Sequence, residues 1–285
     1  MITRKWFFAP LIIACGVILA ACQQSQTDTS GVISPQCACV IDAATNKVIT
    51  PQQLISILKS APVVIVGEQH TSAYHHRIEQ WLLENLARAR PQGSVLMEMI
   101  DITQQRAVDK VKAESQTGAA PSPGRAAATM RWNSGWPWPL YRDVVMTAVK
   151  GDYPLLAANI SRQQVDGLYR KPNFPPGARS AAPQVHEALS AIIYVMHGGQ
   201  IEGEQVRAMV AIQQHRDRFM AEQLRRAPQP SLLIAGGYHA AKDIGVPLHL
   251  QDLQATAPVV VMLTTEGTIL TRRQADYIWS VPKQK

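Results

Sequence analysis

Five short apolar runs constrain the fold of this chain more than any other feature. Their cores consist of Val, Ile, Leu, Ala and Met without polar alternation, and they cover residues 62–67, 93–99, 153–159, 231–236 and 258–264. Strands of this kind are typical of a parallel sheet with both faces covered. Amphipathic stretches predict the covering helices at 51–60, 72–90, 104–113, 139–150, 183–195 and 203–226. We therefore expect an α/β fold with a mostly parallel central sheet and helices on both faces.

Two segments interrupt this alternation. Residues 114–131 have low complexity, and we interpret them as a loop. They lead into the sequence WNSGWPWP at 132–139, which predicts an aromatic loop packed onto another part of the chain. Residues 170–182, rich in Pro and Arg, predict a second connection.

The N-terminal region has the layout of a secretory signal. Arg4 and Lys5 precede an apolar stretch, and residues 1–21 end in small residues before Cys22, which resembles the lipobox of bacterial lipoproteins. We expect lipidation of Cys22, a polar tether over residues 22–38 and a single domain over 39–285. Because Gln23 follows the cysteine, we expect a lipid-anchored protein of the cell envelope, at the outer membrane and facing the periplasm.

The charge of the chain argues against one class of partner. Its formal net charge is +7, and its Lys and Arg residues are scattered instead of forming a run. Nucleic-acid binding proteins usually concentrate basic residues in one patch or stripe. We therefore expect no nucleic acid among the partners.

Polar side chains follow four of the apolar runs. Two runs stop at Gly, two residues and His, in the sequences GEQH at 67–70 and GGYH at 236–239. The carboxyl ends of parallel strands meet at one edge of a sheet, where ligands gather. We therefore expect a site built from Glu68, His70, Glu98, Asn159, Tyr238 and His239.

Two helices are expected to add side chains to this edge. Gln213 and Asp217 are four residues apart and share one helix face, so we interpret them, together with Asn159, as supporting residues of the site. His76 lies near the first turn of the helix at 72–90, next to a strand end.

Several blocks together resemble a known family. They read GEQHTSAYHHR, SVLMEM, WPWPLYRDV, AANISR, QQHRDRFMAEQL and AGGYHAAKDIGVPLHL, in family order between about residues 60 and 250. They are similar to the ChaN-like haem-binding lipoproteins of the Tiki/TraB/erythromycin-esterase-like superfamily. This resemblance implies haem binding for iron uptake or handling, without enzyme activity, by a homodimer that holds haems between its subunits with tyrosine as the iron ligand.

Several tyrosines could serve as that ligand, because a phenolate suits ferric iron. Tyr141 follows the Trp/Pro loop within a family-like block and is our first choice, with Tyr238 second, while Tyr153, Tyr169 and Tyr194 remain open. Trp136 could flank the porphyrin, and His76 and Arg142 could hold its propionates. The chain has no Cys-x-x-Cys-His, so covalent haem attachment is not indicated.

Two alternatives use the same edge of the sheet differently. Tiki-like members of the superfamily are regarded as metal-dependent proteases, and Glu68, His70, Glu98 and His239 could bind a divalent metal with a glutamate as general base. In the other alternative the protein is non-catalytic, and these side chains only hold the strand ends together.

Overall fold

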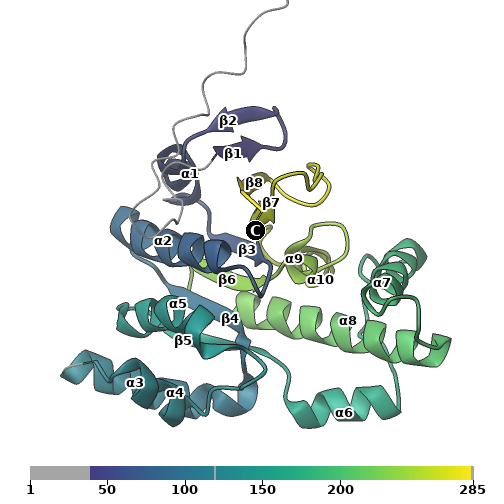
Figure 1. Ribbon diagram of the computed structural model, residues 1–285, viewed down its shortest axis with the longest axis horizontal. Helices are drawn as coiled ribbons and strands as arrows, with labels where there is room; N and C mark the ends of the chain where they lie inside the picture. Colours follow the sequence, from purple (N-terminus) through teal and green to yellow (C-terminus); the bar gives the residue numbers. More distant parts are fainter. Residues whose placement is uncertain (1–38, 119, 284–285) are drawn as a thin grey trace, which may run out of the picture.

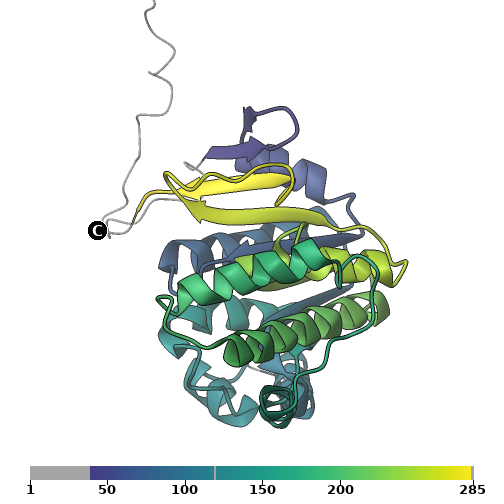
Figure 2. The ribbon, with the colours of Figure 1, turned by 90° about the vertical axis from the view of Figure 1, so that its right-hand side faces the viewer.

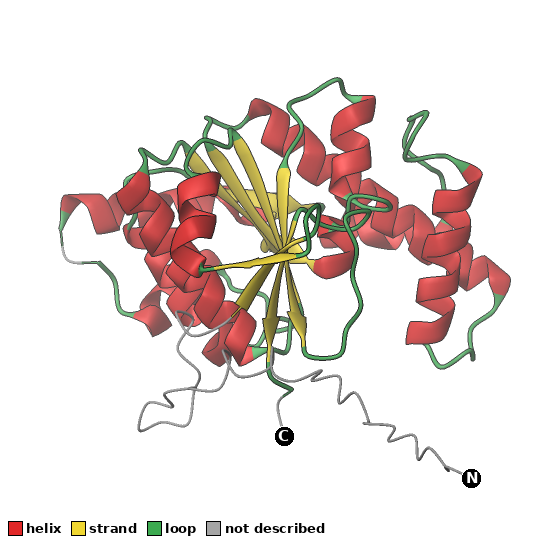
Figure 3. Cartoon of the chain, turned by 90° about the horizontal axis from the view of Figure 1, so that it is seen from above, coloured by secondary structure: helices red, strands yellow, loops and turns green. Residues whose placement is uncertain are grey.

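An eight-stranded sheet forms the centre of the computed structural model, which describes residues 39–118 and 120–283. The strand order is β2-β1-β8-β7-β3-β6-β4-β5. The strands from β8 to β5 pair in parallel, whereas β1 and β2 are antiparallel additions at one side. Figure 3 shows the twisted sheet between two groups of helices. The predicted fold class, α/β with a mostly parallel sheet, is confirmed.

The five apolar runs form five consecutive parallel strands of the sheet, as the sequence predicted. These strands are β3(Val63–Glu68), β4(Ser94–Asp101), β5(Leu155–Asn159), β6(Ser231–Gly236) and β7(Val259–Thr265). Three further strands were not predicted, and they are β1(Cys39–Asp42), β2(Lys47–Ile49) and β8(Tyr277–Val281). They have three to five residues, and polar residues such as Asp42, Lys47 and Ser280 keep them from forming an uninterrupted apolar run.

The helices divide between the two faces of the sheet. One face is covered by α1(Pro51–Leu58), α2(Ala73–Ala89), α3(Gln105–Thr117), α4(Pro123–Met130) and α5(Trp138–Lys150), with a short 3-10 turn, η2(Ile102–Gln104), before α3. The other face carries α7(Pro183–Met196), α8(Gly203–Arg226), α9(Gly237–Ala240) and α10(Val246–Asp252), while α6(Arg162–Arg170) packs against α8. In Figure 1, α7 and the first turns of α8 lie to the right of the sheet, beyond its strands. Figure 2 turns this side toward the viewer.

The structure corrects the interpretation of residues 114–131 as a loop. Helix α3 continues to Thr117, and α4 begins after Ser122, whose side chain accepts a hydrogen bond from the backbone N–H of Arg125. Pro123 at the first helical position and three successive alanines favour this helix. Helix α6 was also missed, although Ser161 and Gln164 form a capping box at its start.

Strand side chains alternate between the two faces, and this alternation sets the directions of the polar residues at the strand ends. In β3, Val64 and Val66 pack toward the α1–α5 side. Glu68 has the same parity and therefore points toward that side. In β4, Leu96 packs toward the α7–α10 side, and Glu98 shares its parity. The two glutamates thus leave the ends of β3 and β4, the strands on either side of β6, in opposite directions.

The predicted signal of residues 1–21, Cys22 and the tether of residues 22–38 lie outside the described residues. Among the helices that the structure describes, none is both long and apolar enough to cross a membrane.

Candidate functional site

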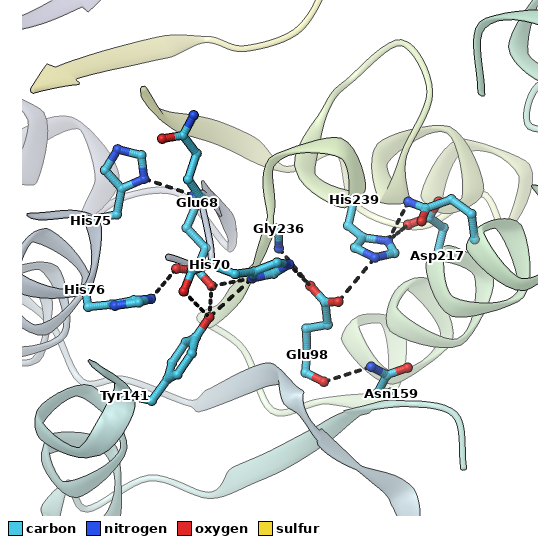
Figure 4. Close-up of polar contacts among 12 residues, drawn as sticks. Glu68, His70, His75, His76, Glu98, Tyr141, Asn159, Asp217, Gly236 and His239 are labelled. Atoms are coloured by element: carbon cyan, nitrogen blue, oxygen red, sulfur yellow. Dashed lines mark hydrogen bonds and ion pairs between the residues drawn. The ribbon is translucent and has the colours of Figure 1, made fainter. Parts of the chain in front are cut away.

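The carboxylate of Glu68 collects three polar partners at the end of β3. Its Oε1 lies 2.8 Å from His70 Nδ1 and accepts a hydrogen bond of 2.7 Å from the Tyr141 hydroxyl. Its Oε2 lies 2.6 Å from His76 Nε2 (Figure 4). Tyr141 comes from α5 and His76 from α2, so two helices of the α1–α5 side and the loop after β3 converge on this one carboxylate.

A second cluster lies on the other side of the strand ends. Glu98 Oε2 accepts a hydrogen bond of 2.8 Å from the backbone N–H of Gly236, and Glu98 Oε1 lies 3.3 Å from His239 Nε2. The other nitrogen of His239 lies 2.6 Å from Asp217 Oδ1 and 2.9 Å from the Gln213 amide. Helix α8 thus places Gln213 and Asp217, two residues predicted to support the site, against His239.

His70 connects the two clusters across the end of the sheet. Its Nδ1 faces Glu68, and its Nε2 lies 3.9 Å from Glu98 Oε2. Trp136 of the Trp/Pro loop packs edge-on against the imidazole, with 4.7 Å between the ring centroids. The side chain of His70 is 37% exposed, whereas the carboxylates beside it are buried. We call Glu68, His70, His76, Glu98, Tyr141, Asp217 and His239 the sheet-edge network.

Two glycines, one in each Gly-x-x-His segment, allow the ends of β3 and β6 to pack closely against their neighbours. A Cβ added to Gly236 would lie 2.7 Å from His70 Nε2, so only glycine leaves room for this imidazole. A Cβ on Gly67 would lie 2.6 Å from the Ala240 side chain, so Gly67 allows α9 to pack closely on β3. The two Gly-x-x-His segments, residues 67–70 and 236–239, therefore pack closely against each other at the ends of β3 and β6.

Buried charges give the network its ionisation pattern. Burial alone would raise the pKa of Glu68, but its contacts with His70 and His76 lower that pKa to about 2. Burial alone would lower the pKa of His239, but the carboxylates of Glu98 and Asp217 raise it to about 10. The pKa of Glu98 falls well below its usual range, because charge on His239 and its hydrogen bonds outweigh burial. At neutral pH, His239 and Glu98 therefore form a pair of an imidazolium and a carboxylate.

The four residues predicted as metal ligands do not converge on one point. Glu68 and Glu98 lie against opposite nitrogens of His70, and an ion could bind only one of these nitrogens. His239 uses both of its nitrogens to contact Asp217 and Glu98. This set extends along the sheet edge as a chain of pairs, so the four side chains do not together surround one divalent ion.

The residues predicted as haem contacts do not surround a common cavity. Tyr141 is fully buried, and burial next to Glu68 raises its pKa far above the usual value, which disfavours the phenolate that iron needs. His76 is also buried. Arg142 is exposed and lies 3.3 Å from Asp143. Tyr238 is 48% exposed on α9. The burial of Tyr141 and His76 argues against both as haem contacts.

Two further residues have clear roles around the network. Asn159, at the end of β5, donates a hydrogen bond of 3.0 Å to the backbone carbonyl of Glu98. Glu79 was not singled out from the sequence, yet it is fully buried on α2. Glu79 lies between Ile78 and Leu82 on the apolar side of the helix, and this position could have predicted from the sequence that it is buried.

A cavity of about 600 Å³ lies in a different region, between α7 and α8. It has mostly apolar walls together with an imidazole, a phenol and a guanidinium. Its lining residues are Phe174, His186, Ser190, Ala191, Tyr194, Gly203, Val206, Arg207 and Val210. We call this cavity the α7–α8 pocket. The sequence analysis left Tyr194 open as a ligand but did not identify the pocket, because its walls come from segments that pair only in the folded chain.

Comparison with known proteins shows the family. The family model described as haem-binding uptake, Tiki superfamily, ChaN matches residues 54–250, which is more than half of the chain. The chain therefore belongs to the ChaN family of haem-binding uptake proteins, and the resemblance stated from the sequence is confirmed. No curated protein is similar enough to count as a match.

One solved structure supports this assignment, and two others are more distantly similar. The structure described as cofacial haem binding to ChaN of Campylobacter jejuni is 30% identical, with a TM-score of 0.78, and the match covers 85% of this chain and 96% of that chain. The type III effector HopBA1 is 11% identical, with a TM-score of 0.47 and coverage of 81% and 92%. The erythromycin esterase mutant EreC H289N is 12% identical, with a TM-score of 0.43 and coverage of 76% and 73%.

Proposed function

We propose that this protein binds haem in the α7–α8 pocket, with Tyr194 as the ligand to ferric iron. The observation that carries the proposal is the pocket itself, which combines an apolar cavity of about 600 Å³ with a half-exposed tyrosine. Cavities of roughly 300–1,000 Å³ are typical of sites for cofactors and other small molecules. Membership of a haem-binding family supports the same ligand.

The side chains of the pocket suit the parts of a haem. Haem supplies ferric iron, for which a phenolate such as that of Tyr194 is a good ligand. Val206, Val210 and Phe174 offer apolar surface to the porphyrin, and Phe174 is held by a ring contact with His186 at 4.6 Å between centroids. Arg207, which is exposed at the rim, and His186 are the candidates to hold the propionates.

We further propose that two copies of the chain meet at this region with their haems between them. The end of α7 exposes Val195 and Met196, at 73% and 64%, next to Tyr194. Exposed apolar residues beside a ligand pocket are typical of a surface that is covered in the bound state. The printed description of the Campylobacter jejuni relative, cofacial haem binding, supports the same arrangement.

A haemin titration of the mature protein tests both proposals together. We expect a saturable Soret shift and a charge-transfer band typical of tyrosine ligation, at about one haem per chain. Sedimentation velocity of the same samples should show the chain become a dimer as haemin is added. A titration without a saturable spectral change would overturn the proposed function.

We also propose that lipid on Cys22 anchors the protein in the outer membrane, facing the periplasm, where it takes part in haem or iron uptake. The lipobox and the Gln23 that follows it support this location. Fractionation of cells that express the full chain or its Cys22→Ser variant tests the proposal. The full chain should sediment with outer membranes, and the variant should not.

Hydrolysis at the sheet-edge network is a second candidate function. One observation favours it: His70 is partly exposed and lies between two buried carboxylates, an arrangement that suits a general base held in one orientation. Glu68 would fix the imidazole through Nδ1, and Nε2 would take the proton from water. Ester and peptide libraries, assayed with and without chelator, test this candidate. Activity that persists in His70→Asn would exclude it.

A further inference from the structure

A carboxylate on α2 is buried in the core without a hydrogen bond to any described residue. This carboxylate belongs to Glu79, which is fully buried, and among residues 39–118 and 120–283 neither of its oxygens has a hydrogen-bond partner. It sits among the apolar residues by which α2 packs onto the sheet, including Ile78 and Leu82. A buried carboxylate is strongly unfavourable unless something pairs with it. The structure therefore leaves Glu79 in need of a ligand.

Two other buried ligand groups face Glu79. One carboxylate oxygen of Glu68, one ring nitrogen of His76 and one oxygen of Glu79 all lie within 4.8 Å of one another. Glu68 Oε2 and His76 Nε2 are only 2.6 Å apart, yet the contact lacks the angles of a hydrogen bond. Their lone pairs are therefore not used up between them, and both atoms remain available to a third partner.

A single proton would not satisfy this cluster. A proton shared by Glu79 and Glu68 would pair one oxygen of Glu79 and leave the other without a donor. It would also leave His76 Nε2 and Glu68 Oε2 in contact without a hydrogen bond. A cation at the common point would contact the carboxylate oxygens and the imidazole nitrogen at once.

We propose that Glu68, His76 and Glu79 bind one divalent first-row transition-metal ion. An imidazole nitrogen with carboxylate oxygens is a donor set that suits Zn²⁺, Fe²⁺ and Co²⁺. This α2 metal site shares only Glu68 with the set predicted from the sequence. It is also separate from the α7–α8 pocket, whose lining includes none of its three ligands. The proposal therefore stands independently of haem binding.

Neighbouring residues already orient the ligands. The Tyr141 hydroxyl and His70 Nδ1 both contact Glu68 Oε1, which leaves Oε2 directed toward His76 (Figure 4). An oxygen of Glu79 lies in the same group of ligand atoms. Outer contacts of this kind commonly fix a metal-binding carboxylate. Tyr141 also packs on the ring of His76, at 4.2 Å between centroids. We therefore assign Tyr141 as a positioning residue of the α2 metal site.

Metal analysis of the haem-free mature chain tests the proposal. The protein is unfolded with chelator, refolded with Zn²⁺ or Co²⁺, passed over chelating resin and analysed for bound metal. We expect about one ion per chain, because a fully buried ion should dissociate slowly. Bound Co²⁺ should give visible absorption bands, and thermal unfolding should occur at a higher temperature with metal than without it.

Matched variants distinguish a bound metal ion from a proton shared between Glu68 and Glu79. Glu79→Gln keeps the shape of the side chain and should lose both the bound metal and the response of the unfolding temperature. Glu222→Gln, on the surface of α8, should behave like the wild type. Tyr141→Phe should bind the ion roughly tenfold more weakly, as expected for a positioning contact. Circular dichroism checks that each variant folds.

Two results would overturn the α2 metal site. The first is a wild-type chain that takes up neither Zn²⁺ nor Co²⁺ on refolding. The second is a folded Glu79→Gln variant that still binds about one ion per chain, which would place the ion elsewhere. Haem titration of the same samples is a separate readout, so failure of the metal proposal leaves the proposed function intact.

Discussion

The sheet-edge network and the α7–α8 pocket differ in almost every physical respect. The network is a buried series of paired charges in which His70 and His239 each lie between two carboxylates. The pocket is open, mostly apolar and lined by Tyr194, His186 and Arg207, which lie on helices away from the strand ends. Satisfied buried charges fix a structure, whereas an apolar cavity with a few polar groups suits a ligand. The contrast suggests that the family's most recognisable motifs organise the fold, and that haem binds elsewhere.

The largest expected effect concerns the stability of the network. Asp217→Ala removes one partner of His239 and leaves a buried imidazolium beside Glu98. Breaking a buried pair in this way typically costs about 3–5 kcal/mol. Urea denaturation should show this loss in the free energy of unfolding, while the haem affinity of the protein that remains folded should not change. A large loss of haem affinity in folded Asp217→Ala would link the two regions.

A glycine substitution tests the close packing of Gly236 against His70. In Gly236→Ala the new methyl group would meet His70 Nε2 at 2.7 Å, so the imidazole must move. Overpacking of this kind costs about 1–3 kcal/mol. Gly124→Ala is the control, because nothing lies within 4 Å of its Cβ. If both variants unfold at the same urea concentration as the wild type, Gly236 and His70 are not as closely packed as the structure indicates.

The rim of the α7–α8 pocket should give a smaller effect on binding alone. Arg207→Gln removes a charge that we expect to pair with a propionate, at an exposed position where such pairs contribute about 1 kcal/mol or less. Haemin affinity should therefore fall several-fold at low salt, and the difference should shrink as salt is added. Arg225→Gln, at the far end of α8, is the matched control. Equal losses in the two variants would point to nonspecific charge attraction.

The smallest effect at neutral pH concerns His249 on α10. Burial lowers the pKa of this histidine to about 4, below the value of 6.5 in an unfolded chain. The unfolded state therefore binds a proton first, and stability should decrease as pH falls from about 6.5 toward 4. In His249→Gln the slope of unfolding free energy against pH should decrease by up to about 1.4 kcal/mol per pH unit in this window. An unchanged slope in urea denaturation series would contradict the assigned burial of His249.

The contrast between the two regions also explains what the sequence could predict. The strand cores and the residues that follow them are local patterns, so the sheet and the meeting of Glu68, His70, Glu98 and His239 followed from parallel topology. The direction of each carboxylate depends on strand register and on Gly236, so the sequence did not reveal the two opposite clusters. Tyr141 looked like a ligand because of its neighbours in sequence, yet α5 buries it against Glu68.

Pocket residues were harder to predict for a different reason. Phe174 belongs to the connection between α6 and α7, Tyr194 to α7 and Arg207 to α8, and no local pattern joins them. Their proximity depends on how the α7–α8 pair packs beyond the sheet. The apolar end of α7, with Val195 and Met196, was the one local signal, because an amphipathic helix does not usually expose such residues without reason.

The central claim is that haem binds through Tyr194 and not through the tyrosines at the strand ends. Haemin titration of wild type, Tyr194→Phe, Tyr238→Phe and Tyr141→Phe, each checked for folding by circular dichroism, tests it most directly. We expect the charge-transfer band of tyrosine ligation in all of them except Tyr194→Phe, whose affinity should fall at least about tenfold, or 1.4 kcal/mol. If Tyr194→Phe keeps the band and Tyr238→Phe or Tyr141→Phe loses it, the iron is bound at the sheet edge and the account is contradicted.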